Sequence, residues 1–208
     1  IFSLLNKFEN YKIVKILRKN CDFRYPSHIN KLFDKFEPDL VINAAAYTNV
    51  DDAEKQKELA YKVNFKSVKI LAKKAFINKI PLIHFSTDYV FDGNKKNSYL
   101  ENDIPKPLNT YGKSKLAGEN AIREIDGQYY IFRTSWVYSN KKKNFYLTIK
   151  KLIKEKKELK IVSDQYGVPT SNAFIAQQIK KIIPLMNNKN KGVYHLVPNG
   201  NCSWYQFS

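Results

Sequence analysis

Continuous apolar runs alternate with longer amphipathic stretches along this chain. The apolar runs predict strands, because a strand covered on both faces of a parallel sheet needs apolar side chains on each face. These predicted strands cover residues 11–17, 39–43, 81–85, 128–133, 159–162 and 193–197. The amphipathic stretches repeat their apolar positions every three or four residues, roughly the helical period, and predict helices. These predicted helices cover residues 27–36, 52–78, 111–125, 145–156 and 173–186.

The order of these elements predicts the fold. Strands and helices alternate as far as residue 138, which is typical of an α/β protein with a doubly wound, Rossmann-like parallel sheet and right-handed crossovers. After residue 138 come a basic helix, a short strand and the turn-rich loop 164–170. We therefore expect two domains, one at residues 1–138 and a smaller, partial one at residues 139–208.

The composition narrows the choice of partners. The chain has 208 residues, of which 43% are hydrophobic, enough to fill a core. Its formal charge of +17 favours an anionic partner. The lysines, however, are spread along the chain, and no RNP pattern, zinc finger or other nucleic-acid motif occurs. We therefore expect no nucleic-acid partner; an anionic nucleotide ligand would benefit from the same charge.

The sequence carries no signal for a membrane, a disulfide or a metal. No apolar run approaches the roughly 18 residues that span a bilayer, and no charged-then-apolar leader begins it. We therefore expect a cytoplasmic protein with no membrane partner. Cys21 and Cys202 lie far apart without metal-ligand spacing, so we expect neither a disulfide framework nor a bound metal.

A tyrosine and a lysine stand four residues apart at the start of a predicted helix, in the segment NTYGKSKLAGE. Tyr111 and Lys115 then share one helix face, a turn apart. An ammonium near the phenol lowers its pKa from about 10, and the phenol can then donate a proton near neutral pH. The same spacing also arises by chance on a solvated helix of a chain rich in Lys and Tyr, so other segments decide its meaning.

Polar, aromatic and small side chains follow the predicted strands. Thr87 and Asp88 come directly after one strand, and Trp136 follows another. Ala45 and Ala46 follow a third, where small side chains let a ligand approach the backbone or simply pack against the next helix. Ligands of open α/β sheets bind at the carboxyl ends of the strands. We therefore expect these segments to meet at a binding site.

Several segments carry a resemblance to a known family. They are VINAAAYTNVDDAE, FSTDYVFDG, PLNTYGKSKLAGE, FRTSWVY, DQYGVPT and the terminal SWYQF. Over residues 11–208 the chain resembles the dTDP-4-dehydrorhamnose reductase family of the extended short-chain dehydrogenase/reductase superfamily. The resemblance implies a dinucleotide-binding Rossmann-like domain at residues 1–138 and a substrate-binding region at residues 139–208.

The resemblance also implies a reaction. It is the reduction, with NADPH or NADH as the cofactor, of the C4 ketone of dTDP-4-dehydro-6-deoxy-L-mannose to give dTDP-L-rhamnose, so the partner is a dTDP-deoxysugar. Tyr111 would protonate the ketone oxygen as hydride reaches C4. Lys115 would lower the pKa of that phenol and bind the nicotinamide ribose. Thr87 would orient the carbonyl without adding a charge.

Further site residues are carried over by motif. Asp88 and Trp136 would contact the substrate, with Val50 and Asp51 as further candidates, and a helix N-cap is an equally open role for Asp51. For Arg133 a structural ion pair is favoured over a ligand contact. The residues that would contact the cofactor are Asp22, Phe23, Ala45, Ala46, Tyr47 and Thr48, together with Tyr111 and Lys115.

The chain departs from the family pattern in two places. The glycine-rich turn that would hold the pyrophosphate is absent, so we expect the first strand to be missing and residues 2–5 to be the tail of the first helix. Whether such a fragment is active by itself stays open. At the end of strand 11–17, the basic pair Arg18 and Lys19 stands where an acidic residue would bind the 2′-hydroxyl of NAD. This pair predicts a preference for NADPH over NADH.

Other interpretations stay open. The same scaffold serves nucleotide-sugar epimerases and dehydratases, although Tyr89 stands where a dehydratase often has a Glu beside its Asp. It also serves a non-catalytic regulatory subunit that binds a partner protein and keeps the dinucleotide site. A homodimer and a metal at a subunit interface are not decided by the sequence.

Overall fold

The computed structural model describes residues 11–141 and 144–208, which fall into two compact units. The first, here the sheet unit, contains Lys15–Arg133 and Asn187–His195. The second, here the smaller unit, contains Thr134–Met186 and Leu196–Ser208 with the described residues up to Val14. The division into domains at residue 138 stays a prediction, and residues 2–5 lie outside the described residues.

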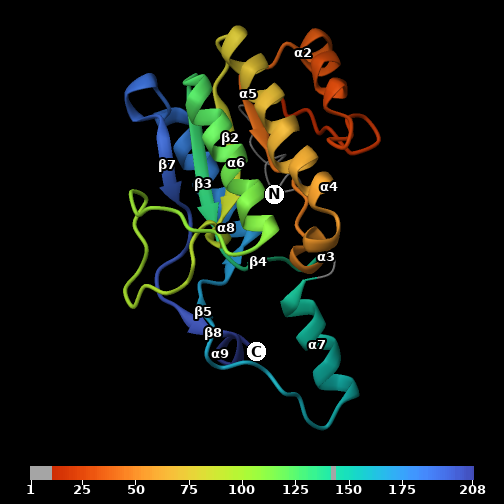
Figure 1. Ribbon diagram of the computed structural model, residues 1–208, viewed down its shortest axis with the longest axis vertical. Helices are drawn as coiled ribbons and strands as arrows, with labels where there is room; N and C mark the ends of the chain where they lie inside the picture. Colours follow the sequence, from red (N-terminus) through yellow and green to blue (C-terminus); the bar gives the residue numbers. More distant parts are fainter. Residues whose placement is uncertain (1–10, 142–143) are drawn as a thin grey trace. The chain divides into compact units, whose positions relative to one another are not determined.

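A four-stranded sheet forms the centre of the sheet unit (Figure 1). Its strand order is β1-β2-β3-β7. Strands β1 and β2 are parallel, and strands β3 and β7 are also parallel. This confirms the predicted α/β, Rossmann-like class with mostly parallel strands. The strand bounds are Val41–Asn43 for β1, Leu82–Thr87 for β2, Tyr129–Thr134 for β3 and Gly192–His195 for β7.

Helices connect these strands. Helices α5 and α6 lie side by side along the sheet (Figure 1). The helices of the sheet unit are α2 Asn30–Phe36, α3 Val50–Lys55, α4 Lys57–Tyr61, α5 Ser67–Ile77 and α6 Thr110–Ile125. Its single turns are η1 Pro26–Ile29, η2 Lys62–Lys66, η3 Asp88–Val90 and η5 Asn188–Asn190.

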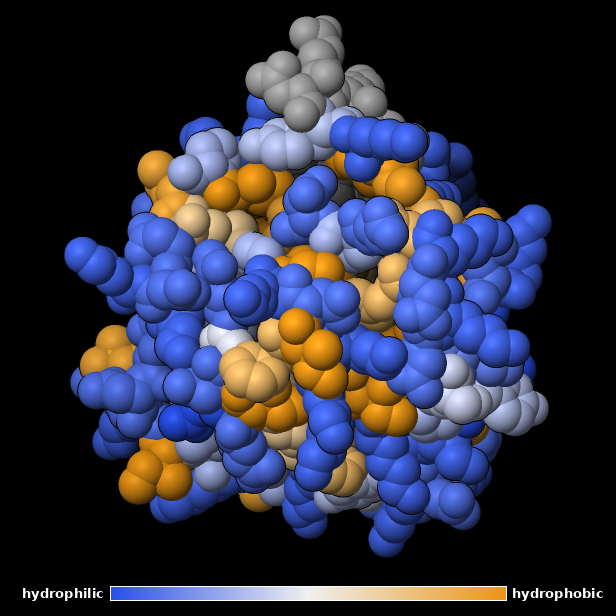
Figure 2. All heavy atoms as spheres, turned by 90° about the horizontal axis from the view of Figure 1, so that it is seen from above, coloured by the Kyte–Doolittle hydropathy of each residue, from blue (hydrophilic) through white to orange (hydrophobic). Residues whose placement is uncertain are grey.

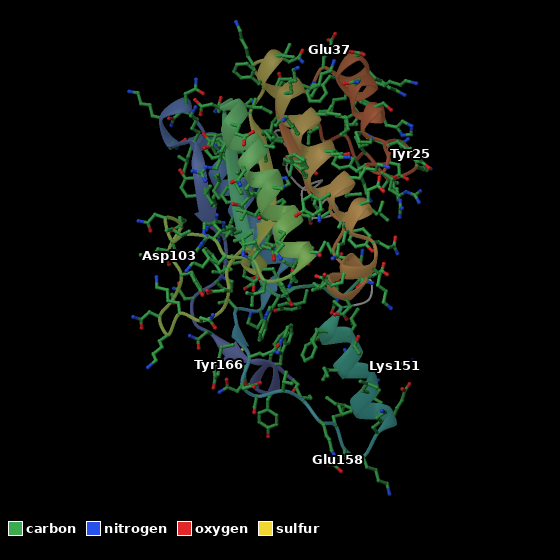
Figure 3. All side chains as sticks on the ribbon, viewed as in Figure 1. Tyr25, Glu37, Asp103, Lys151, Glu158 and Tyr166 are labelled. Atoms are coloured by element: carbon green, nitrogen blue, oxygen red, sulfur yellow. The ribbon has the colours of Figure 1, made fainter. Side chains whose placement is uncertain are left out.

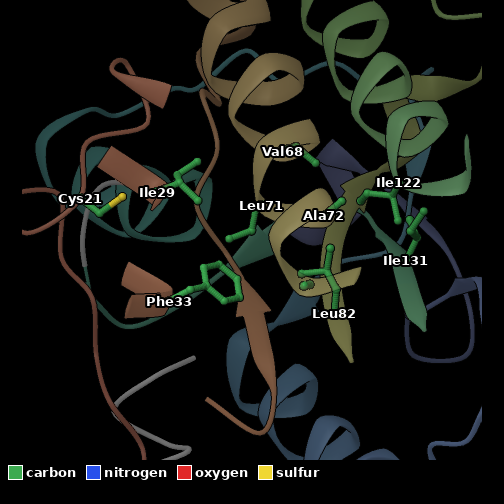
Figure 4. Packing of buried hydrophobic residues seen from close by; sticks show 10 residues of the cluster. Cys21, Ile29, Phe33, Val68, Leu71, Ala72, Leu82, Ile122 and Ile131 are labelled. Carbon is green, nitrogen blue, oxygen red and sulfur yellow. The ribbon is translucent and has the colours of Figure 1, made fainter. Parts of the chain in front are cut away.

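The core lies between the sheet and helices α5 and α6. Leu71 and Ala72 of α5 meet Leu82 of β2, and Ile122 of α6 meets Ile131 of β3 (Figure 4). These side chains are at most 4% exposed, and burying a Leu or Ile contributes about 1.5–3 kcal/mol each. The periodic apolar positions of the sequence therefore form the face that fixes α6 on the sheet.

Three predicted elements differ from the structure. Segments 11–17 and 159–162 are not strands. Apolar runs suggested strands there, but a strand also needs neighbours, and β1 pairs only with β2 within the described residues. The predicted helix 52–78 is divided into α3, α4, η2 and α5, since Gln56 has non-helical angles and η2 is a π-helical turn.

The smaller unit contains two short strand pairs. Strand β4 pairs in parallel with β6, and β5 pairs with β8 in the antiparallel sense. The bounds are β4 Val137–Tyr138, β5 Tyr166–Gly167, β6 Thr170–Ser171 and β8 Cys202–Ser203. Its helices are α7 Phe145–Glu155, α8 Asn172–Ile182 and α9 Trp204–Phe207, with the turn η4 at Ile183–Leu185.

Charged side chains cover much of the surface. The face drawn in Figure 2 is mainly hydrophilic, with hydrophobic side chains in small groups between. Lys151 of α7 and Glu158 after it are exposed, whereas Asp103 of the loop before α6 is half-buried and pairs with Lys95 (Figure 3). Among the described residues, no helix is both long and apolar enough to cross a bilayer.

Candidate active site at the carboxyl edge of the sheet

The first turn of helix α6 is fixed from two sides. Asn109 caps the helix, since its side-chain oxygen accepts a hydrogen bond from the Gly112 N–H at 2.8 Å. Glu54 of α3 accepts two more, from the Thr110 N–H at 2.6 Å and the Thr110 hydroxyl at 2.8 Å. These bonds lower the pKa of the Glu54 carboxyl. The backbone that carries Tyr111 is therefore held in place before any ligand contact is considered.

A glycine lets this turn approach the end of strand β2. A Cβ on Gly112 would lie 2.1 Å from the Tyr89 carbonyl oxygen, far closer than real atoms come. The η3 turn can therefore pack directly on α6, and the Tyr89 and Tyr111 rings meet edge to face with centroids 5.6 Å apart. Glycine at this position brings Tyr111 to the residues that follow β2.

Thr87, Asp88 and Tyr111 form one polar cluster, in which Thr87 is buried and the other two residues are half-buried. The Thr87 hydroxyl donates to Asp88 Oδ1 at 3.0 Å and accepts from the Tyr89 N–H at 3.2 Å. Burial raises the pKa of Asp88 to about 6, although the Thr87 hydrogen bond opposes the shift. Burial likewise raises the pKa of Tyr111 to about 12, against a hydrogen bond with Thr87 that lowers it. The cluster joins a neutral phenol to a carboxyl that titrates near neutral pH.

Lys115 lies one turn further along α6 and is 2% exposed. Its Nζ donates to the Phe85 carbonyl oxygen at 2.6 Å and lies 3.3 Å from His84 Nε2. Burial lowers the pKa of Lys115 to about 8, partly opposed by the Glu119 carboxylate. The sequence led us to expect a lowered pKa for Tyr111. That direction is wrong for this structure, because burial of the phenol outweighs its favourable contacts.

Arg133 and Glu119 form a buried ion pair. The Arg133 Nη2 lies 2.7 Å from Glu119 Oε2, and its Nε donates to Oε1 at 3.1 Å. The guanidinium also lies over the Phe91 ring, 5.0 Å from its centroid. The ion pair that the sequence favoured for Arg133 is therefore confirmed.

The segment after β1 is held by a buried asparagine. Asn64 of η2 accepts from the Tyr47 N–H at 2.9 Å, and its amide donates to the Tyr47 carbonyl and to the Ser114 hydroxyl, each at 3.0 Å. Ala45 and Thr48, on either side of Tyr47, are exposed, whereas Ala46 is half-buried. The Tyr47 hydroxyl donates to Asp52. This segment thus offers small side chains and accessible backbone at the carboxyl edge.

Asp22 is an ion-pairing residue in this structure. Its carboxylate accepts from Arg24 at 2.6 Å and from Arg18 at 3.3 Å, and the Arg24 hydrogen bonds lower its pKa well below the usual range. Phe23 packs on the core, and its carbonyl accepts from the Ser67 hydroxyl at 2.6 Å. Both residues thus have structural partners, and their predicted contact with a cofactor stays a prediction.

Val50 and Asp51 lie in the first turn of α3. The N-cap is Asn49, whose side chain accepts from the Asp52 N–H at 3.3 Å. The alternative role of Asp51 as an N-cap is therefore wrong. The exposed Asp51 carboxylate and the half-buried Val50 keep their predicted substrate role as a prediction.

Trp136 belongs to the smaller unit and has its neighbours there. Its indole stacks on Trp204 with centroids 3.5 Å apart and an angle of 10° between the rings. A Cβ on Gly167 would come within 2.4 Å of the same indole. The Trp136 backbone has a φ of 44°, which is uncommon for a residue with a side chain. The ring expected to form a flat wall is thus held rigidly, with one face covered.

Sequence reasoning missed four residues that support the cluster. Glu54 fixes the backbone around Tyr111, and Asn64 fixes it around Tyr47. His84 contacts Lys115 directly, and Asn43 contacts His84. One signal was present, since His84 is a polar residue inside an apolar run that must form a buried strand. Among the described residues, no group of three or more His, Cys, Asp or Glu could hold a metal ion.

A parallel sheet that carries a threonine, a tyrosine and a lysine at its carboxyl edge defines a Rossmann-like α/β protein of the short-chain dehydrogenase/reductase type. The comparison with known proteins is more specific. The chain belongs to the family of the RmlD substrate binding domain, whose model matches residues 3–208.

Curated relatives agree with this family. The chain is 43% identical over 189 residues to the dTDP-4-dehydrorhamnose reductase of Escherichia coli strain K12, a match that covers 90% of this chain and 63% of that protein. It is 39% identical over 203 residues to that of Burkholderia thailandensis, covering 95% and 68%. The chain thus spans slightly less than two thirds of the Escherichia coli protein.

Solved structures share the fold. A dTDP-4-dehydrorhamnose reductase from Bacillus anthracis, in complex with NADP, matches with a TM-score of 0.92 and 36% identity over 99% of this chain and 73% of that chain. The corresponding protein of Clostridium acetobutylicum matches with the same TM-score, 39% identity and the same coverage. The family resemblance of the sequence is therefore confirmed.

Proposed function

We propose that the full-length protein containing this chain reduces the C4 ketone of dTDP-4-dehydro-6-deoxy-L-mannose to dTDP-L-rhamnose with NADPH. The observation that carries the proposal is the polar cluster of Thr87, Asp88 and Tyr111, with Lys115 a turn along α6. Relatives of the chain that are named dTDP-4-dehydrorhamnose reductase support the same activity.

Tyr111 is the proton donor in this proposal. A phenol with a pKa near 12 is fully protonated at neutral pH, so its proton is available to a ketone oxygen that becomes basic as charge develops on it. Thr87 hydrogen-bonds the same phenol and orients the carbonyl without adding a charge. The ammonium form of Lys115 stabilises the phenolate that remains, and a pKa of about 8 keeps this form available near neutral pH.

The substrate contacts follow from burial and charge. Asp88 accepts a hydrogen bond from a sugar hydroxyl, and its raised pKa makes that contact sensitive to pH near 6. Trp136 offers its half-buried indole as an apolar wall. Val50 and Asp51, at the start of α3, are the remaining substrate candidates.

The chain fits part of a dinucleotide cofactor. The exposed Ala45 and Thr48 leave the backbone after β1 open to a ribose or phosphate, with Ala46 and Tyr47 beside them. The first glycine of the given sequence is Gly93, so the residues that would hold the pyrophosphate are not among residues 1–92. When bound, the reduced nicotinamide supplies the hydride, and Lys115 and Tyr111 are the residues that would contact its ribose.

The basic residues near Asp22 favour NADPH over NADH. Arg18 and Arg24 both contact the Asp22 carboxylate, and Lys19 lies exposed beside Arg18. The two arginines on one carboxylate, with Lys19 next in sequence, leave a net positive charge for a 2′-phosphate. We expect kcat/KM to be higher with NADPH than with NADH in the full-length protein; comparable values would remove this preference.

The decisive assay follows NADPH oxidation by the full-length protein with dTDP-4-dehydrorhamnose, beside Tyr111→Phe. A general acid contributes about 10²–10⁴-fold, so kcat should fall by that factor in Tyr111→Phe. Tyr25→Phe, at a residue 56% exposed, is the matched control and should keep wild-type activity. Equal turnover by Tyr111→Phe and wild type would remove Tyr111 as the acid. No turnover by either would favour a non-catalytic regulatory subunit.

A further inference from the structure

A chain of buried hydrogen bonds connects the backbone after β1 to Lys115. The Ala45 N–H donates to Asn43 Oδ1 at 3.1 Å, and Asn43 Nδ2 lies 2.9 Å from His84 Nδ1. His84 Nε2 in turn lies 3.3 Å from Lys115 Nζ. Asn43, His84 and Lys115 are 4%, 0% and 2% exposed. Protons in this chain therefore have no ready exchange with bulk water.

The first hydrogen bond, from the Ala45 N–H, fixes which atom donates and which accepts in each of the following hydrogen bonds. A backbone N–H such as that of Ala45 can only donate, so the Asn43 atom that faces it must be the carbonyl oxygen. The amide nitrogen of Asn43 then faces His84 Nδ1 and donates to it. Burial lowers the pKa of His84 well below its usual value, so the ring is neutral. A neutral imidazole that accepts at Nδ1 carries its single hydrogen on Nε2.

This hydrogen points at Lys115. An ammonium has only donors, so it cannot accept a hydrogen bond from the His84 Nε2–H and would face it with like polarity. A neutral amine has a lone pair for that hydrogen, and it can still donate to the Phe85 carbonyl at 2.6 Å. The neutral amine thus satisfies both neighbours, whereas the ammonium satisfies only one.

We propose that Asn43 and His84 are positioning residues for Lys115: they hold His84 as its Nε2–H tautomer and thereby favour the neutral amine of Lys115. For its catalytic consequence the inference rests on the proposed function. Lys115 then gains and loses a proton close to neutral pH, in agreement with its lowered pKa of about 8. The phenolate left by Tyr111 is stabilised only while Lys115 is protonated, so reduction should decline as pH rises through that value.

Few other charges act on Lys115 in the described part of the chain. Glu119, on the same helix, raises the pKa of Lys115, and Glu119 is itself paired with Arg133 of β3. From β2 the facing group is His84, whose pKa is lowered first by burial and then by Lys115. From η2, Asn64 meets α6 at Ser114 with neutral groups only. The tautomer of His84 is therefore the main influence on the protonation of Lys115 that a substitution can change.

The substitution Asn43→Asp keeps the shape of the side chain but reverses the donor and acceptor roles in the hydrogen bonds that lead to Lys115. A carboxylate accepts from both the Ala45 N–H and His84, so the imidazole must carry a hydrogen on Nδ1. His84 Nε2 then becomes available to accept from the Lys115 ammonium. We expect the alkaline limb of kcat/KM against pH to move upward by at least about one unit, a tenfold change in the protonation equilibrium of Lys115. Asn188→Asp, at an exposed position of η5, is the matched control and should leave the limb in place.

The tautomer has its own readout, which does not depend on activity. Long-range ¹H–¹⁵N spectra of the full-length protein with ¹⁵N-labelled histidine distinguish Nδ1–H from Nε2–H, and the signals missing in His84→Gln identify His84. We expect Nε2–H in the wild type and a hydrogen on Nδ1 in Asn43→Asp. A wild-type Nδ1–H tautomer would overturn the proposal, even if the variant failed to fold.

The two readouts separate this inference from the proposed function. An alkaline limb that is the same in Asn43→Asp and Asn188→Asp would also overturn the link to Lys115. If the wild type reduces no deoxysugar, the proposed function fails, and the histidine spectra still decide the tautomer. Nε2–H in an inactive protein would support the hydrogen-bond chain by itself.

Discussion

The substitution Glu119→Gln should strongly destabilise the protein, because it leaves a buried arginine without its counter-charge. In the wild type the two side chains share two hydrogen bonds, and Glu119 is 0% and Arg133 3% exposed. Glutamine keeps the shape of the side chain but has no charge. Its amide can accept from the guanidinium at one position only and turns a donor toward the other.

The size of the effect follows from burial. Removal of one partner of a buried ion pair costs about 3–5 kcal/mol, because the remaining charge stays desolvated. The other contacts of Arg133, with the Glu101 carbonyl at 3.4 Å and the Phe91 ring at 5.0 Å, are too weak to replace a carboxylate. Glu58→Gln is the matched control, since Glu58 is 82% exposed in its pair with Lys62 and such pairs contribute at most about 0.5 kcal/mol.

Urea unfolding of the full-length protein measures the difference. We expect the midpoint of Glu119→Gln to fall with an unchanged m-value, and that of Glu58→Gln to stay close to wild type. The double substitution Glu119→Met with Arg133→Met should recover at least half of the loss, because it leaves no buried charge. A loss below about 1 kcal/mol for Glu119→Gln would refute the reasoning, since an exposed pair would explain it equally well.

Three further substitutions test the packing and charge of the site. Gly112→Ala should cost about 1–3 kcal/mol in urea unfolding, because the new methyl overlaps the η3 carbonyl, whereas Gly127→Ala has room and should be near neutral. Asp88→Asn should become more stable relative to wild type as pH rises: a folded-state pKa of about 6, above the unfolded value, gives stability that is complete below about pH 4 and lost through pH 6. Urea midpoints from pH 4 to 8 measure this, and a constant difference would contradict it. Gly167→Ala should displace the Trp136 indole and weaken the near-ultraviolet circular dichroism of the stacked indole pair, and an unchanged spectrum would count against that packing.

The sheet could be predicted because its strands are short apolar runs. Segments 39–43, 81–85, 128–133 and 193–197 each overlap a strand, since a continuous apolar run is a property of the strand's own residues. Segment 11–17 has the same kind of composition and is not a strand. Whether an apolar run joins a sheet depends on neighbours, and local sequence does not contain them.

The site was predictable only where a motif names its residues. Thr87, Asp88 and Tyr111 were predicted from short segments, and the structure brings them together. The partners of Lys115 were not predicted, because His84 is 31 residues away and Asn43 acts only through His84. Such contacts depend on the register between β1 and β2, which places Asn43 opposite His84.

Burial alone does not mark a functional site, and the sheet unit contains the comparison that shows this. Glu119 and Arg133 are as buried as any charged residues in the described structure, yet each satisfies the other and needs no ligand. Lys115 is also buried and Asp88 is half-buried, but neither has an oppositely charged partner in direct contact. Burial therefore raises one pKa to about 6 and lowers the other to about 8. Two groups whose pKa values are shifted toward neutral pH, at the edge where ligands of parallel sheets bind, are typical of functional sites and agree with the proposed function.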